Sequence, residues 1–401
     1  MKIVVVALLL SLPLAAQGKF QGRVDEAIAE GSGFLVRVLR RQPAERMRSG
    51  EISLSVLALL HCGLDPEDAV IQRGVALLSK DASQTYDVAL RLMVAEMLRD
   101  PGLKSRAEKD LKWLVRAQGA DGGWRYGQNS RKSDNSCTQY ALLGLRAAKA
   151  LKLDVPTRTW DRALRYVVGQ ITREGGTGYQ DARRATMNMT VGALSSLVIA
   201  RDGVKGSRDS QKQKRAAKYQ KRTLAFLTRK WSGPLVHGRS FYGLYGLERA
   251  MAFARVERLG KKDWYRLGAE WLLGQQEKKN GSWVGRAVQT SFALLFLRRA
   301  THRRGGVTMS NLSTVMAKLG PNATEKDVAA LVVQLCKRGM RVCRPLLHYL
   351  ESDSRVVRAA AVGALRKLTG MRFDFDPRRR YEENGEAVVR WTRHVLLAEG
   401  K

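Results

Sequence analysis

The sequence predicts an all-helical protein in which a ring of six helix pairs is followed by a small helical domain. Three observations support this fold class. Apolar residues recur at intervals of three and four residues along most of the chain, as the buried face of a helix requires. No segment shows the alternation of apolar and polar residues that is typical of strands. A turn signature containing Gln, Gly and Trp returns along the chain, which is typical of repeat proteins.

The first residues have the features of a signal peptide. Lys2 supplies a positive charge, and an apolar run over residues 3–12 follows it. The small residues Ala15 and Ala16 suit cleavage by a signal peptidase near residues 16–18. A membrane anchor is the alternative, but the run is shorter than the roughly 20 residues that a spanning helix needs. We therefore expect residues 1–18 to be cleaved, the protein to be exported to the periplasm or the extracellular space, and no transmembrane span to remain.

Two segments carry the full turn signature. WLVRAQ at 113–118 is followed by a Gly-containing turn and Trp124, and WLLGQQ at 271–276 is followed by another such turn and Trp283. A weaker copy lies at residues 166–179. Glycine permits a positive-φ turn after a helix, the Gln amide can pair backbone groups of a neighbouring helix end, and the Trp ring can cover the junction. We expect the signature to fix the junction between helix pairs rather than to bind a ligand.

Three further positions carry only the apolar part of the signature, at residues 34–36, 75–78 and 224–231. A second helical stretch rich in Ala and Leu follows each of the six positions. These stretches are residues 54–60, 88–98, 140–151, 191–199, 241–253 and 288–297. Residues 20–302 thus divide into six helix pairs of roughly 47 residues each. Because one pair cannot bury its apolar faces alone, neighbouring pairs must stack, and six can close into a ring.

The turns that end at Trp124 and Trp283 resemble the repeats of terpene cyclases of the squalene–hopene type and of protein prenyltransferase beta subunits. The resemblance covers roughly residues 20–302. It implies an α-α toroid over residues 19–304, with a cavity lined by the starts of the inner helices. In those families the cavity binds isoprenoid chains, so an isoprenoid lipid is one expected ligand.

The chain departs from both families at the residues that carry their chemistry. Class II terpene cyclases protonate an alkene with an aspartic acid in a D-x-D-D-T-A stretch, and here Ser136 stands at the proton-donating position. Asp134, Cys137 and His237 are the candidates of the types that hold zinc in prenyltransferases, but the Asp–Cys spacing differs. We therefore expect no catalytic residue, no metal and no cofactor.

The starts of the inner helices are expected to form a polar and aromatic rim. Three aspartates precede successive inner helices at intervals of 47 residues. Carboxylates are favourable at helix N-termini, so capping is the alternative explanation, as core packing is for the tyrosines. The candidate ligand-binding residues are Asp87, Asp134, Cys137, Asp181, His237, Arg239, Tyr242 and Tyr245.

The pattern changes after residue 304. Helices are expected at residues 327–337, 342–350, 352–365 and 386–397. The third of these resembles a HEAT-type repeat through its acid, Val-Arg and Ala-Ala-Val pattern. We expect residues 305–401 to form a small HEAT-like domain that either binds a protein partner or caps the toroid. Cys336 and Cys343 flank a turn and are expected either to pair or to be buried thiols.

The formal net charge of +34 favours anionic partners. The densest basic run, residues 205–230, holds ten basic residues and one acidic residue. It is either a solubilising surface or a site for an anionic envelope polymer. Export argues against nucleic acid.

We therefore expect an exported, non-catalytic toroid that binds a lipid, polymer or protein as a scaffold in the cell envelope. The alternative is a terpene cyclase-like enzyme that acts on an isoprenoid lipid with rearranged acids. A closed apolar cavity with a desolvated carboxyl would favour the enzyme, and a plugged centre would favour the scaffold.

Overall fold

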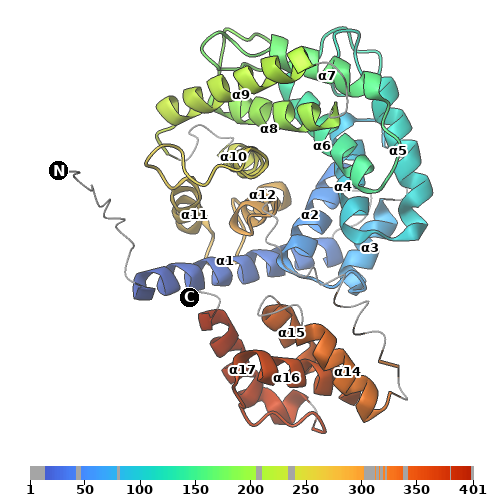
Figure 1. Cartoon of the computed structure of the whole chain (residues 1–401), viewed down its shortest axis with the longest axis vertical. Coiled ribbons are helices and arrows are strands. Elements are labelled where there is room, and N and C mark those ends of the chain that lie inside the picture. The colour runs from blue at the N-terminus through green and yellow to red at the C-terminus, as the bar shows by residue number, and fades with distance from the viewer. Residues whose placement is uncertain are drawn as a thin grey trace, which may run out of the picture. The chain divides into compact units, whose positions relative to one another are not determined.

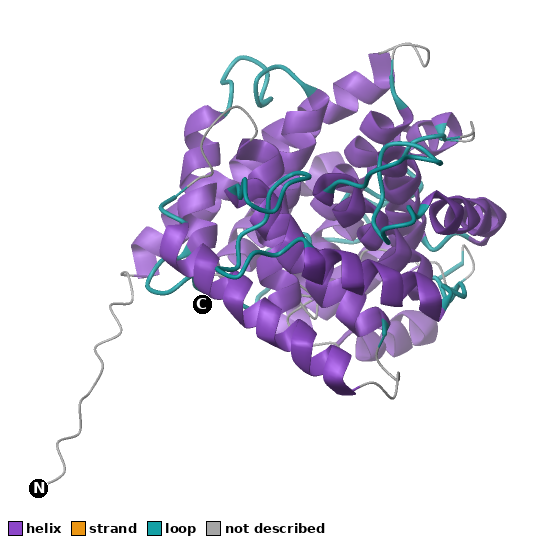
Figure 2. Cartoon of the chain, turned by 90° about the horizontal axis from the view of Figure 1, so that it is seen from above, coloured by secondary structure: helices purple, strands orange, loops and turns teal. Residues whose placement is uncertain are grey.

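Helices account for all regular structure in the part of the chain that the computed structural model describes (Figures 1 and 2). That part comprises residues 14–41, 47–78, 82–204, 210–233, 240–301, 323–336, 342–379 and 381–398, with Leu312, Met316, Leu319 and Gly320. Within these residues there are isolated bridge pairs but no strand. The predicted all-α class is therefore confirmed. Over the same ranges, no helix has both the length and the apolar character needed to span a membrane.

The chain divides into two units, Ala27–His302 and a second unit that joins Arg303–Lys401 to Met1–Glu26. The division after residue 302 is close to the one predicted after residue 304, but residues 19–26, predicted as part of the first domain, belong to the second unit. The helices up to residue 302 are α1 Leu14–Arg41, α2 Ser49–Cys62, α3 Ala69–Leu77, α4 Thr85–Leu98, α5 Lys104–Ala117, α6 Asn135–Ala150, α7 Thr157–Gly169, α8 Met187–Gly203, α9 Ser210–Lys230, α10 Ser240–Ala254, α11 Trp264–Gln275 and α12 Ala287–Leu297.

The even-numbered helices α2 to α12, called the inner helices below, overlap the six Ala- and Leu-rich stretches of the sequence. They are largely apolar and buried on all sides, and in α8 every residue from Met189 to Ala200 is buried. A helix of that composition has to be covered on all sides. Each inner helix contacts the next one, and α12 contacts α2. Figure 1 shows α5, α7 and α9 outside this set.

Backbone approaches are close where small residues face each other. A Cβ atom built on Gly144 of α6 would lie only 2.8 Å from the Cα atom of Ala89 in α4. No larger residue fits there unless the two helices move apart.

The last helices of the first unit are bonded to the first ones. Gln276 Nε2 donates to the Ala27 carbonyl at 2.9 Å, and Arg37 Nη2 donates to the Asn280 carbonyl at 2.7 Å. Arg298 Nε donates to the carbonyl of His61 at 3.0 Å. Hydrogen bonds between the first and last segments of this unit therefore accompany the contact between α12 and α2.

Both full signature turns have the same geometry. Gln118 Nε2 donates to the carbonyls of Gly122 and Thr159 at 2.9 and 3.0 Å, and Gln276 Nε2 bonds Gly281 and Ala27 in the same way. The indole nitrogen of each signature Trp donates to the preceding helix at 2.8 Å. The junction role predicted for Gln is confirmed, with one correction. Thr159 and Ala27 lie within α7 and α1 and are not unpaired helix-end groups, so the amide adds a second donor to a helical carbonyl.

A threonine in the following inner helix, not predicted from the sequence, bonds to each of these turns. The backbone N–H of Trp124 donates to Thr138 Oγ1 at 3.0 Å, and that of Trp283 donates to Thr290 Oγ1 at 3.0 Å. Thr190 accepts equivalently from residue 177 at 3.1 Å. Each threonine is the fourth residue of its inner helix and also donates to the carbonyl that precedes that helix. The hydroxyl thus ties the signature turn to the next inner helix.

The second unit has its own core around α14 Glu325–Cys336, α15 Cys343–His348, α16 Arg355–Thr369 and α17 Gly385–Ala398. The expected HEAT-type stretch overlaps α16, and the expected last helix overlaps α17. The buried guanidinium of Arg358 donates to the carbonyls of Pro377 and Asp353. No disulfide forms among the described residues. Cys343 is a buried thiol and Cys336 a half-buried one.

Candidate functional site

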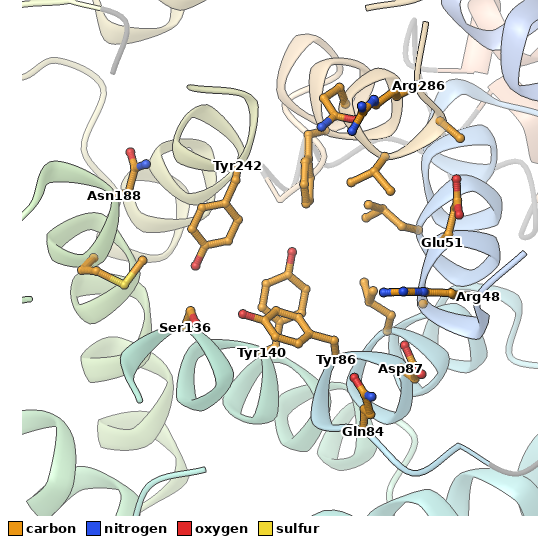
Figure 3. Close-up of a pocket in the computed structure, with 18 of the residues that line it drawn as sticks. Arg48, Glu51, Gln84, Tyr86, Asp87, Ser136, Tyr140, Asn188, Tyr242 and Arg286 are labelled. Carbon is orange, nitrogen blue, oxygen red and sulfur yellow. The ribbon is translucent and has the colours of Figure 1, made fainter. Parts of the chain in front are cut away.

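A cavity of about 1920 Å³ lies in the first unit, at the starts of the inner helices (Figure 3). Every inner helix contributes to the lining from its first turn. These contributions include Ser49 of α2, Tyr86 of α4, Ser136 of α6, Met187 of α8, Tyr242 of α10 and Ala287 of α12. This placement matches the one that the family resemblance implied.

Five tyrosines line the cavity: Tyr86, Tyr126, Tyr140, Tyr179 and Tyr242. The ring centroids of Tyr86 and Tyr140 are 4.5 Å apart, and those of Tyr140 and Tyr242 are 6.4 Å apart. Burial raises the pKa of Tyr86 and Tyr242 above the ordinary phenol value. These phenols therefore stay protonated at neutral pH and keep a hydroxyl proton to donate.

A buried polar chain holds Tyr242 in place. Its hydroxyl donates to Gln139 Oε1 of α6 at 2.8 Å, and Gln139 Nε2 donates to Ser195 Oγ of α8 at 3.2 Å. Three inner helices are thus joined by side-chain hydrogen bonds next to the cavity. A fully satisfied buried network of this kind limits the rotation of the side chains in it.

Two carboxyl groups line the cavity on one side, next to Arg48 (Figure 3). Burial raises the pKa of Asp87, and the backbone N–H of Gly50 and the guanidinium groups of Arg91 and Arg48 oppose that rise. Burial also raises the pKa of Glu51, again opposed by Arg48. Both carboxyls are therefore partly desolvated at the cavity wall.

Asp134 does not line the cavity but lies behind its tyrosines, and it is fully buried. As the residue before α6, it accepts from the Cys137 backbone N–H at 2.7 Å and from Ser136 Oγ at 2.8 Å. Its second oxygen accepts from the Tyr179 hydroxyl at 3.1 Å, which is 3.2 Å from the Tyr126 hydroxyl. Asp134 therefore caps α6 and orients two cavity tyrosines.

The predicted rim residues are distributed unevenly. Asp87 and Tyr242 line the cavity, while Asp134, Cys137 and Tyr245 are buried without lining it. The Tyr245 ring centroid lies 6.2 Å from that of Tyr140, so Tyr245 packs behind the wall. His237 and Arg239 lie outside the described residues.

The prediction for Asp181 was wrong. Its side chain is exposed and pairs with Arg183 at 3.5 Å. The residues that immediately precede α4, α6 and α8 are Gln84, Asp134 and Thr186, at intervals of 50 and 52 residues. The 47-residue spacing of the three aspartates therefore does not follow the helix starts.

Among the described residues, no group of three or more His, Cys, Asp or Glu side chains can hold a metal, and His237, the third zinc candidate, lies outside those residues. The Asp134 carboxylate is occupied by hydrogen-bond donors, and desolvation by burial raises the pKa of the Cys137 thiol.

Of the five tyrosines that line the cavity, only Tyr242 was predicted from the sequence. Tyr126 and Tyr179 each stand two residues after a signature position, Trp124 and its counterpart Thr177. The carbonyl of Tyr126 accepts from the first residue of α4 at 2.7 Å, and that of Tyr179 accepts from the first residue of α6 at 3.0 Å. The recurrence of Tyr at this position was the available signal.

Comparison of the chain with protein-family models gave no match, and comparison with curated proteins gave none either. The cavity itself therefore carries the functional interpretation.

Proposed function

We propose that Ala27–His302 is an α-α toroid of six helix pairs, and that the protein is an exported, non-catalytic binding protein. The pairs are α1 with α2, α3 with α4, and so on to α11 with α12. The series of contacts from α2 to α12 and back to α2 supports this arrangement. The hydrogen bonds from Gln276 to Ala27 and from Arg37 to Asn280 support it independently.

The observation that carries the binding function is the cavity where the inner helices begin. Its volume of about 1920 Å³ exceeds the roughly 300–1000 Å³ of ordinary small-molecule pockets. Its wall combines aliphatic side chains with tyrosines and charged groups. A ligand with apolar surface and several polar groups suits such a wall, whether it is an isoprenoid lipid or part of an envelope polymer.

Two features favour binding without catalysis. The position that carries the acid in terpene cyclases is Ser136, which donates a hydrogen bond to Asp134 at 2.8 Å. Asp134, the remaining aspartate of that stretch, is buried behind the cavity wall and caps α6. Neither residue can deliver a proton into the cavity.

A cyclase-like enzyme is the second candidate, and the raised pKa of Asp87 favours it. A carboxylic acid kept protonated by burial can act as a general acid. The test is incubation of the protein with squalene and with polyprenyl phosphates. The enzyme hypothesis predicts cyclic products that disappear in Asp87→Asn, and the binding hypothesis predicts unchanged compounds.

The binding function is tested on protein purified from its own host by native mass spectrometry and lipid analysis. We expect one small molecule per chain. Met187 lines the cavity, so Met187→Trp should reduce the bound fraction by filling space. Met371→Trp places the same side chain in the second unit as a control. Equal occupancy in both variants, or no bound molecule in the natural chain, would refute the proposal.

A further inference from the structure

The cavity wall is more polar than a hydrocarbon ligand requires. Of the thirty lining residues, twelve have polar or charged side chains and five more are tyrosines. Each such group that loses water without gaining a partner costs binding free energy. Some of them, such as Ser136, Tyr179 and Tyr242, already bond within the protein, but a purely aliphatic chain would offer no partner to the rest. The ligand must therefore offer many hydrogen-bonding groups of its own.

The same wall also offers aromatic surface. The linked rings of Tyr86, Tyr126 and Tyr140 form a continuous row, with centroid separations of 6.0 and 4.5 Å. Figure 3 shows Tyr86, Tyr140 and Tyr242 around one space. Tyrosine combines an apolar ring with a hydroxyl at its tip. Saccharides match this combination, because each sugar ring has C–H faces and a rim of hydroxyls.

The charged side chains that line the cavity indicate which class of saccharide would bind there. Three exposed cations line the cavity: Arg48, Lys230 and Arg286. Over the described residues, none of them has a carboxylate within ion-pair distance. The two lining carboxyls, Glu51 and Asp87, are partly desolvated, and Asp87 accepts from the Gly50 N–H. Three cations without an ion-pair partner among the described residues favour a ligand that carries carboxylates.

The positive charge of the cavity lining continues outside the cavity along the basic helix α9. Lys230, its last residue, lines the cavity, and the exposed Lys214, Lys218, Lys221 and Arg229 lie at helical spacing along it. The helix has eight basic residues and no acidic one. At 1.5 Å per residue, the row spans about 24 Å from residue 214 to residue 230. An anionic chain that leaves the cavity can follow this row.

We propose that the cavity binds a segment of an acidic polysaccharide built from uronic acid units, and that α9 holds the continuing chain. The inference rests on the proposed binding function of the cavity. Sugar rings pack against the tyrosines, and carboxylates are held by Arg48 and Arg286. The overall charge of +34 accelerates the approach of such a polymer.

The test is titration of the full chain with hexagalacturonate, followed by calorimetry and by tyrosine and tryptophan fluorescence. We expect saturable binding that weakens about tenfold or more in Arg48→Gln/Arg286→Gln, because two charge-assisted contacts are lost. Tyr126→Ala should weaken it as well. Arg116→Gln/Arg165→Gln, two exposed cations on α5 and α7 that do not line the cavity, serves as the matched control and should bind normally.

Two comparisons separate the cavity from α9. Lys214→Gln/Lys218→Gln/Lys221→Gln should leave hexagalacturonate binding unchanged but weaken binding of polygalacturonate. Neutral cellohexaose should bind at least about tenfold more weakly than hexagalacturonate if the cations contribute as argued. Polyglutamate should not displace hexagalacturonate from the site that depends on Arg48.

The outcomes distinguish this inference from the proposed function. If hexagalacturonate does not bind saturably, or if polyglutamate displaces it equally well, the saccharide assignment is wrong. If a polyprenyl phosphate then binds and Met187→Trp blocks it, the cavity is still a binding site for a different ligand. If neither compound binds and no molecule accompanies the protein from its host, both proposals fail.

Discussion

Gln276 and Ala27 are 249 residues apart in the chain and are joined by a hydrogen bond of 2.9 Å from the side-chain amide to the backbone carbonyl. Gln118, at the matching place in the other full signature, makes the equivalent bond of 3.0 Å to Thr159, only 41 residues further along. The same motif therefore bonds to the next outer helix, α7, in the middle of the first unit and to α1 near the end of that unit.

Gln276→Ala and Gln118→Ala each remove two side-chain hydrogen bonds, and we expect each to lower the free energy of unfolding by about 1–3 kcal/mol. Their local effects should differ. Gln276→Ala should speed amide hydrogen exchange in residues 27–41, whereas Gln118→Ala should speed it in residues 157–169. Urea unfolding and hydrogen exchange measure the two effects. Identical exchange maps would show that Gln276 does not hold the ends together.

Arg91 and Asp110 form a buried ion pair between α4 and α5, with side chains only 6% and 4% exposed. Arg91 Nε donates to Asp110 Oδ2 at 2.7 Å, and Nη2 donates to Oδ1. Asp110→Asn leaves a buried guanidinium without its counter-charge, so we expect a loss of about 3–5 kcal/mol in unfolding free energy. Thermal and urea unfolding provide the measurement.

The matched experiment on this pair is the double variant Arg91→Met/Asp110→Leu, which removes both charges. It should be more stable than Asp110→Asn, because no charge is left buried alone. A double variant that is less stable than the single one would mean that the pair itself, rather than an uncompensated charge, provides the stability.

Thr138 Oγ1 accepts the backbone N–H of Trp124 at 3.0 Å and donates to the carbonyl of Asp134 at 2.7 Å. Thr138→Val keeps the shape and removes the hydroxyl, so we expect a loss of about 1–3 kcal/mol. Thr138→Ser keeps the hydroxyl and should recover most of that loss. If Ser is as damaging as Val in thermal unfolding, the methyl group and not the hydrogen bond is the important part of Thr138.

His61 at the end of α2 should make the protein sensitive to mild acid. Burial, together with smaller contributions from the guanidinium groups of Arg249 and Arg298, lowers its pKa from 6.5 to about 3. Between these two values the unfolded chain binds a proton that the folded chain does not, so stability falls as pH drops from 6.5 toward 3. His61→Gln should flatten this part of a plot of melting temperature against pH. His394→Gln, in the second unit, is the control and should leave the contribution of His61 in place.

The inner helices were predictable because a helix that is buried on all sides has a recognisably apolar local sequence. A helix that is covered on all sides must be apolar on all sides, and the stretches 191–199 and 288–297 show this directly. The signature glutamines were predictable for a similar reason, since a conspicuous amide beside a Gly turn has few roles. The carbonyl that each amide bonds to was not predictable, because nothing in the sequence distinguishes Ala27 and Thr159 from their neighbours.

The sequence by itself determined the helical class, the positions of the buried helices and the absence of the usual cyclase acid, because each depends on a residue and its near neighbours. Only the tertiary structure decided which side chains share a cavity. Asp87, Asp134 and Asp181 are equally spaced in sequence, yet one lines the cavity, one is buried behind its wall and one is exposed. Turn lengths between helices set the register of each helix start, and a shift of a few residues redirects a side chain from the cavity to the core or the solvent.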